Sequence, residues 1–313
     1  MARSKRFHNY FRRKQPKKHI HITRAHLDQF SESDIQRLID HKDNFLKYYW
    51  DYHNELAYQR SKITDKIKES LLEATQKVFK FEKWQRTLKY QYANEPFSVS
   101  GSLIDPGGRF NIGNINVSQF PTFPALYLAS DKNTAIQELL SQKIDSEQSN
   151  SRLDALDFAL TSHASIAVVS MSGSIGSIIN LKDPKGLKPF VNLIKDFKIS
   201  DSLKKAARAI KEPEPILIQT VPKLIEALLH PNWRFWPMQF DVPVASQIFG
   251  QLVFEAGVKG ILYTSKFTSK DCLAIFPQNF EESSFIQLDD EVPGGTKLVR
   301  LDMHTWKYVR KLQ

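Results

Sequence analysis

The sequence predicts an α+β fold rather than a doubly wound α/β fold. Apolar residues recur at helical spacing in the first third of the chain, and from about residue 93 short apolar runs alternate with turn residues without a regular strand–helix–strand repeat. A chain of 313 residues with 41% hydrophobic and 25% charged residues can bury a large core. This length accommodates one large domain or two smaller ones.

Residues 1–27 are predicted to form a basic tail. They hold nine of the 44 Lys and Arg residues and none of the 34 Asp and Glu residues, so the rest of the chain is nearly neutral. Such a tail can hold nucleic-acid phosphates without sequence preference, or it can serve as a solubilising arm. No apolar run follows it as in a signal peptide, no stretch approaches a membrane span, and Cys272 is the single cysteine. We therefore expect a soluble cytoplasmic protein with no membrane contact.

Residues 28–92 are predicted to form a helical extension. "SESD" at 31–34 offers a helix N-cap, and apolar residues recur at helical spacing from Ile35 to Leu56. A second stripe runs from Ile67 to Leu88 with steps of three and four, which predicts a helical hairpin or one longer helix.

Residues 93–313 are expected to form the main domain. "ALYLAS" at 125–130 predicts a buried strand, and the following "DKNTAIQELLSQ" predicts a helix capped by Asp131 or Asn133. A strand is expected at 165–173, with "SGSIGS" at 172–177 as a turn. The other expected elements are helices at 202–211, 222–229 and 244–256, and strands at 260–265 and 271–276.

Several familiar kinds of site are not supported. His19, His21 and His26 lie close together, but no second cluster with ligand spacing completes a metal site, and none is expected. "SGSIGS" lacks the lysine of a P-loop and the glycine spacing of a dinucleotide-binding turn. No Ser-His-Asp triad can be chosen among nine scattered histidines.

Arg109 and Glu138 are the candidates for chemistry. Two glycines precede Arg109 and let the backbone approach a ligand, while the guanidinium offers a planar fork to a phosphate or carboxylate. Glu138 lies on the predicted helix among apolar residues. Taken alone, an arginine beside such a turn is more often a surface residue, and an ordinary amphipathic helix could carry Glu138 to solvent.

Three blocks taken together resemble the RES-domain family, named for an Arg, a Glu and a Ser. "GGRFN" at 107–111, "ALYLASDKNTAIQE" at 125–138 and "ASQIFGQLVFEAGVKGILYTSK" at 245–266 occur in the family's order, and the resemblance covers roughly residues 93–285. It places the family's Arg on Arg109, its Tyr on Tyr127, its Glu on Glu138 and its Ser on Ser265.

The resemblance implies an ADP-ribosyltransferase-like fold and an NAD-degrading toxin whose antitoxin partner covers the site. It assigns NAD binding to Gly108 and Asn111 as well as to Arg109, Tyr127 and Ser265. Many members carry another arginine on an earlier strand, whereas the corresponding stretch at 95–103 has none. The long stretch at 141–240 is expected to form a lid or an added subdomain.

The chemistry of NAD agrees with these residue types. Nicotinamide leaves as a neutral molecule and needs no acid, so one carboxylate, Glu138, can stabilise the oxocarbenium-like ribose. Arg109 would hold the pyrophosphate, Tyr127 would pack on nicotinamide or its ribose, and Ser265 would hydrogen-bond oxygens and fix the carboxylate. NAD is then the substrate, and no cofactor or metal is required. Hydrolysis, phosphorolysis and ADP-ribosyl transfer to a protein all remain open. Nucleic-acid binding through the tail, with the pocket inactive, is the alternative outside enzymology.

Overall fold

A computed structural model describes residues 42–140, 166–212, 215, 217–231, 233–291 and 295–311. The predicted basic tail and the histidines at 19, 21 and 26 lie outside these residues. The chain divides into two compact units, one of residues 1–56 with 199–215 and one of residues 57–198 with 216–313. Among the described residues, no helix has the length and apolar character needed to cross a membrane.

The first unit contains most of α3 (Lys42–Ser61) together with α9 (Asp201–Ala209). The carboxylate of Glu55 on α3 accepts hydrogen bonds from the backbone N–H and the hydroxyl of Ser200. Ser200 in turn caps α9, because its Oγ accepts from the N–H of Leu203 at 3.3 Å. The helices predicted over these two ranges are therefore confirmed where the structure describes them.

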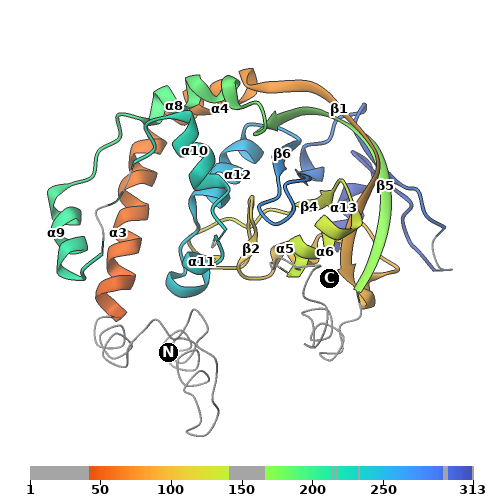
Figure 1. Cartoon of the computed structure of the whole chain (residues 1–313), viewed down its shortest axis with the longest axis horizontal. Coiled ribbons are helices and arrows are strands. Elements are labelled where there is room, and N and C mark those ends of the chain that lie inside the picture. Colours follow the sequence, from red (N-terminus) through yellow and green to blue (C-terminus); the bar gives the residue numbers. More distant parts are fainter. Residues whose placement is uncertain are drawn as a thin grey trace, which may run out of the picture. The chain divides into compact units, whose positions relative to one another are not determined.

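The second unit is built on a seven-stranded sheet with the order β1-β4-β7-β6-β5-β8-β9. β1 also pairs with β5, so the pairings of five strands close into a ring, and Figure 1 shows β1 and β5 running side by side. All pairs are antiparallel except β5–β6. The strands are β1 (Thr75–Lys89), β4 (Leu126–Ala129), β5 (Ile166–Asn180), β6 (Gly260–Thr264), β7 (Asp271–Ile275), β8 (Phe285–Leu288) and β9 (Arg300–Asp302).

A two-stranded sheet and short helices complete this unit. β2 (Gly107–Gly108) pairs with β3 (Asn111–Ile112). The helices are α4 (Thr64–Glu73), α5 (Ser100–Leu103), α6 (Lys132–Leu140), α8 (Lys188–Ile194), α10 (Val221–Leu228), α11 (Phe235–Phe240), α12 (Ala245–Glu255) and α13 (Trp306–Lys311), and the 3-10 turns are η2 (Tyr90–Tyr92), η3 (Pro184–Leu187) and η4 (Pro277–Asn279). The α+β class is confirmed, as are the strands and helices predicted at 125–140 and at 222–276.

The prediction of helix through residues 78–88 is wrong. These residues belong to β1, which pairs with β5 from Thr75↔Ile179 to Lys89↔Ile166. The stretch is rich in β-branched and aromatic residues, which favour strands when partner strands are present, and Val78 in the supposed helical stripe is 56% exposed. The strand content of the chain therefore begins before residue 93.

The turn predicted at 172–177 is also wrong, because these residues continue β5. Glycine and serine weaken an isolated strand, but here β1 pairs along one side of β5 and β8 along the other. Pairing on both sides supplies the hydrogen bonds that favour an extended backbone over a turn.

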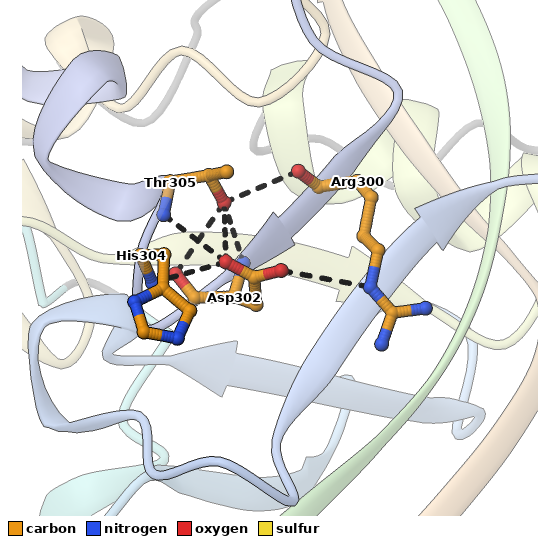
Figure 2. A network of polar contacts seen from close by, with 4 residues as sticks. All are labelled: Arg300, Asp302, His304 and Thr305. Carbon is orange, nitrogen blue, oxygen red and sulfur yellow. Dashed lines mark hydrogen bonds and ion pairs between the residues drawn. The ribbon is translucent and has the colours of Figure 1, made fainter.

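A polar network closes the link between β9 and α13 (Figure 2). Asp302 accepts hydrogen bonds from the backbone N–H groups of His304 and Thr305, both at 3.0 Å, and from the Thr305 hydroxyl at 2.9 Å. Burial would raise the pKa of Asp302, but these hydrogen bonds outweigh it and lower the pKa. Arg300 lies 3.6 Å from the carboxylate and stacks on the Phe285 ring, so the network is structural.

Candidate functional site

Asn111 organises the loop that carries Arg109. Its Oδ1 accepts from the Gly108 N–H at 2.9 Å and from the Tyr127 hydroxyl at 2.8 Å. Its Nδ2 donates to the carbonyls of Ser102 at 2.6 Å and Phe123 at 3.1 Å. These bonds occupy both donors and both acceptor positions of a side chain that is 0% exposed. The Asn111 side chain therefore positions the loop and Tyr127, and its contact with NAD stays a prediction.

Gln247 on α12 holds the same loop from the other side. Its Nε2 lies within hydrogen-bond distance of the carbonyls of Pro106 at 2.8 Å, Gly108 at 3.2 Å and Asn111 at 3.2 Å. α12 can come this close because Gly250 faces the Phe110 carbonyl, where any Cβ would clash. Two buried amides, on β3 and on α12, thus fix the backbone around Arg109.

Tyr127 on β4 packs against the loop through Gly108. A Cβ at Gly108 would overlap the Tyr127 hydroxyl, so glycine is needed there for packing. The hydroxyl accepts from the Phe110 N–H at 3.0 Å and donates to Asn111. Burial raises the pKa of Tyr127 well above its ordinary value, so the phenol remains neutral. The half-buried ring, rather than the hydroxyl, is the part left for a ligand.

Arg109 is a buried cation with a spare hydrogen-bond donor. It is 3% exposed, and its Nη1 donates to the carbonyl of His230 at 2.9 Å. Its Nε is buried and meets no hydrogen-bond acceptor among the described residues. The Trp233 ring centroid lies 5.7 Å from its Cζ. A buried guanidinium with a neutral carbonyl as its hydrogen-bond acceptor is suited to an anionic ligand.

Glu138 and Arg109 act electrostatically on the same groups. After burial, which is the largest cause, Glu138 raises and Arg109 lowers the pKa of both Tyr263 and Cys272, and the net shifts are upward. The same two charges act on Tyr127 and on Arg234. The structure therefore brings Glu138 on α6 and Arg109 beside β2 into one half-buried to buried cluster, although they are 29 positions apart in the sequence.

Ser265 is placed at the end of β6, as predicted, but its hydrogen bonds are internal. Its buried Oγ accepts from the N–H groups of Phe267 at 3.1 Å and Thr268 at 3.4 Å. The Thr268 hydroxyl lies 2.7 Å from that of Thr134, which is one turn before Glu138 on α6. Ser265 thus shapes the β6–β7 turn that meets the start of α6, the helix that carries Glu138.

Asp131 caps α6, and its carboxylate holds Thr134 by both the N–H at 2.9 Å and the hydroxyl at 2.6 Å. This cap fixes the first turn of the helix that presents Glu138. The expected choice between Asp131 and Asn133 is settled in favour of Asp131.

Two further arginines, Arg86 and Arg234, lie outside the stretch at 95–103, where no arginine occurs. Arg86 on β1 donates from Nη2 to the Ser98 carbonyl, and burial lowers its pKa to about 10, which leaves it charged at neutral pH. Arg234 precedes α11 and is coupled to Arg109 and Glu138. Arg234, Trp233 and Tyr263 were not predicted from the sequence, because their positions follow from the folding of distant segments onto the "GGRFN" loop.

Comparison with known proteins finds a family match for the part of the chain that carries Arg109 and Glu138. Residues 83–190 match the family model of the RES domain. This part of the chain is similar to the RES domain. The matched range includes the last part of β1, the "GGRFN" loop, Tyr127 and Glu138. It ends before Trp233, Arg234 and Ser265. The match to the RES model thus covers Arg109, Tyr127 and Glu138, and later segments supply the other residues of the cluster.

Other comparisons add little. No curated protein matches the sequence. A solved structure described as the M. tuberculosis MbcT-MbcA toxin-antitoxin complex is similar over 79% of this chain and 97% of that chain, with 13% identity and a TM-score of 0.41. A TM-score this low carries no conclusion about this protein. Within the part of the chain that the structure describes, no group of three or more His, Cys, Asp or Glu residues could hold a metal ion.

Proposed function

We propose that this chain consumes NAD by breaking the bond between nicotinamide and ribose, and that it acts as the toxin of a toxin–antitoxin pair. The observation that carries the proposal is that the charges of Glu138 and Arg109 both act on Tyr127, within the segment that matches the RES model. A carboxylate beside a buried guanidinium offers complementary groups to a substrate with a cationic glycoside and an anionic diphosphate.

The mechanism follows from the charges of the substrate. The C1′–N bond breaks, nicotinamide departs with the bonding electron pair as a neutral molecule, and positive charge develops on the ribose. The Glu138 carboxylate stabilises that charge, which is greatest in the transition state. A nucleophile then bonds to C1′ and, when it is water, releases its proton to solvent, which gives ADP-ribose. The Glu138 carboxylate therefore needs no proton for the departure of nicotinamide.

The remaining cluster residues serve to hold the substrate. Arg109 binds the diphosphate through its fork, and the half-buried ring of Tyr127 packs on nicotinamide or its ribose. Neutral Tyr127 and Tyr263 keep the surroundings of Glu138 free of further negative charge. Ser265 supports α6 and through it the position of Glu138.

The test is to incubate the purified chain with NAD, with and without inorganic phosphate, and to identify the products by mass spectrometry. ADP-ribose means hydrolysis, a phosphorylated ADP-ribose means phosphorolysis, and added mass on protein means ADP-ribosyl transfer. Glu138→Gln is expected to abolish most product, whereas Glu226→Gln, an exposed glutamate on α10, should not change it. Unchanged NAD with the folded wild-type chain would refute the proposal.

The toxin role has its own test in cells. Induced expression of the wild-type chain should stop growth and deplete NAD, and Glu138→Gln should do neither. Co-expression of an antitoxin that covers the site should reverse both effects. Growth arrest without NAD loss would separate toxicity from the proposed chemistry.

A further inference from the structure

The segment that joins α10 to α11 lies against Arg109. The His230 carbonyl accepts the Arg109 Nη1 hydrogen bond at 2.9 Å, and the Trp233 ring stands 5.7 Å from the Arg109 Cζ. Trp233 is 5% exposed, so its ring is a fixed surface. This segment lies beyond the RES match, in the stretch between the "ALYLASDKNTAIQE" block and α12.

Arg234 shares that ring with Arg109. The Arg234 Cζ lies 4.2 Å from the Trp233 centroid, so the two guanidiniums can be no further apart than the sum of their distances to it. Arg234 is half-buried, and among the described residues nothing accepts a hydrogen bond from its guanidinium. Burial lowers the pKa of Arg234, Arg109 lowers it further by repulsion, and Glu138 opposes both.

The two cations at this ring repel each other, and the Glu138 carboxylate offsets that repulsion only in part. Partial burial removes water from both guanidiniums, and their mutual repulsion adds to that cost. Arg109 also keeps a buried Nε without an acceptor. Together the pair offers spare donors on two neighbouring planar forks, and phosphoryl oxygens match such forks bidentately.

We propose that Arg234 is a second anion-binding residue and that, with Arg109, it grips the two phosphoryl groups of a diphosphate linkage, with Trp233 as the rigid spacer between the forks. This inference rests on the proposed function in taking the ligand to be a dinucleotide. Each arginine then receives one phosphoryl group. The segment between α10 and α11 thus supplies a substrate-positioning residue from outside the RES match.

The arrangement makes the number of phosphates a determinant of affinity. A diphosphate engages both arginines, whereas a monophosphate engages one of them. ADP-ribose is the suitable probe because it carries the diphosphate and has no bond to nicotinamide, so its binding requires no chemistry. AMP, with one phosphate on the same adenosine, is the matched monophosphate.

The experiment measures ADP-ribose and AMP binding by calorimetry with wild type, Arg234→Gln and Arg234→Lys. Arg234→Gln should weaken ADP-ribose binding by about 10- to 100-fold, and AMP binding by no more than about threefold. Arg234→Lys should recover only part of the loss, because it keeps the charge without the fork. The control is Arg300→Gln, which also removes one positive charge and one cation–π contact, because the Arg300 Cζ lies 4.0 Å from the Phe285 ring centroid. This substitution should change neither the ADP-ribose nor the AMP affinity.

Measuring NAD turnover tests the role of Arg234 separately from the proposed function. With NAD, Arg234→Gln should raise KM and leave kcat within a few-fold, because the reacting bond is contacted by other groups. If wild type cleaves NAD and Arg234→Gln keeps the wild-type KM and ADP-ribose affinity, the second anion-binding residue is refuted and the function stands. If wild type binds ADP-ribose through Arg234 but never cleaves NAD, the anion site stands and the function is refuted. Equal losses for ADP-ribose and AMP would also overturn the diphosphate assignment.

Discussion

Replacing Asn111 by aspartate should expose how much of the site depends on one buried amide. The change keeps Oδ1, which accepts from Gly108 and Tyr127, but turns the donating Nδ2 into an oxygen that faces the carbonyls of Ser102 and Phe123. Two donated hydrogen bonds are lost, and each buried acceptor left unsatisfied costs about 1–3 kcal/mol, so the free energy of unfolding should fall by about 2–6 kcal/mol at neutral pH.

The loss of stability in Asn111→Asp should increase as the pH rises. A fully buried carboxylate beside two carbonyl oxygens has its pKa raised in the folded protein, so the folded state binds the proton more tightly than the unfolded chain does. The penalty is therefore smallest below the unfolded pKa of about 4 and grows by about 1.4 kcal/mol per pH unit above it. Between about pH 5 and about pH 7 the variant should lose about 2–3 kcal/mol relative to wild type.

The assay is urea unfolding of wild type and Asn111→Asp at both pH values. Asn114→Asp is the matched control, because Asn114 is exposed and lies three positions further along the same segment. It should show neither the loss nor the pH dependence. Wild-type stability of Asn111→Asp, or a penalty that is equal at both pH values, would refute the account of a fully engaged buried amide.

Four further outcomes follow from the site. Glu138→Gln should slow nicotinamide release at saturating NAD by about 100- to 1,000-fold, while thermal melting shows an intact fold. Arg109→Lys should weaken NAD binding by about 1–3 kcal/mol, seen as a higher KM, because lysine loses the fork that reaches both His230 and a phosphate. Tyr127→Phe should flatten the fall in stability above about pH 10 by about 1.4 kcal/mol per pH unit, measured by denaturation, because the phenol ionises in the unfolded chain before the folded one. Deleting residues 1–27 should leave NAD turnover within a few-fold, and loss of turnover in a folded protein would contradict this.

Local signals located the elements that carry the first part of the site. The strand at Leu126–Ala129 and the capped helix at Lys132–Leu140 were predictable because an apolar run and an Asp cap act within a few residues. β1 was not predictable in this way, since its apolar residues fit helical spacing and its strand conformation depends on β5, about 90 positions later. Long-range pairing overrides a local pattern in this case.

Roles within the site were harder to predict than its position. Asn111 looks like a ligand-binding residue when read beside Arg109, yet its four hydrogen bonds leave it no free donor or acceptor. Nothing in the sequence around Asn111 reveals this, because two of its partners, Phe123 and Tyr127, reach it only after the chain has folded back. The same holds for Gln247, which serves three carbonyls of a loop about 140 positions earlier.

Arg234 shows why a missing arginine on one strand does not imply a missing charge in the site. Electrostatic binding of a diphosphate requires guanidiniums near the phosphoryl groups and is indifferent to which segment supplies them. The chain places Arg234 beside Arg109 through Trp233, whose ring contacts both, and the His230 carbonyl ties the same segment to Arg109. Because the Trp233 ring lies against both guanidiniums, replacing Trp233 by a smaller residue should displace Arg234 and Arg109 together. Substituting either arginine should leave the other in place. The indole therefore positions both arginines, and in the proposed anion site the segment that carries the indole contributes to ligand binding.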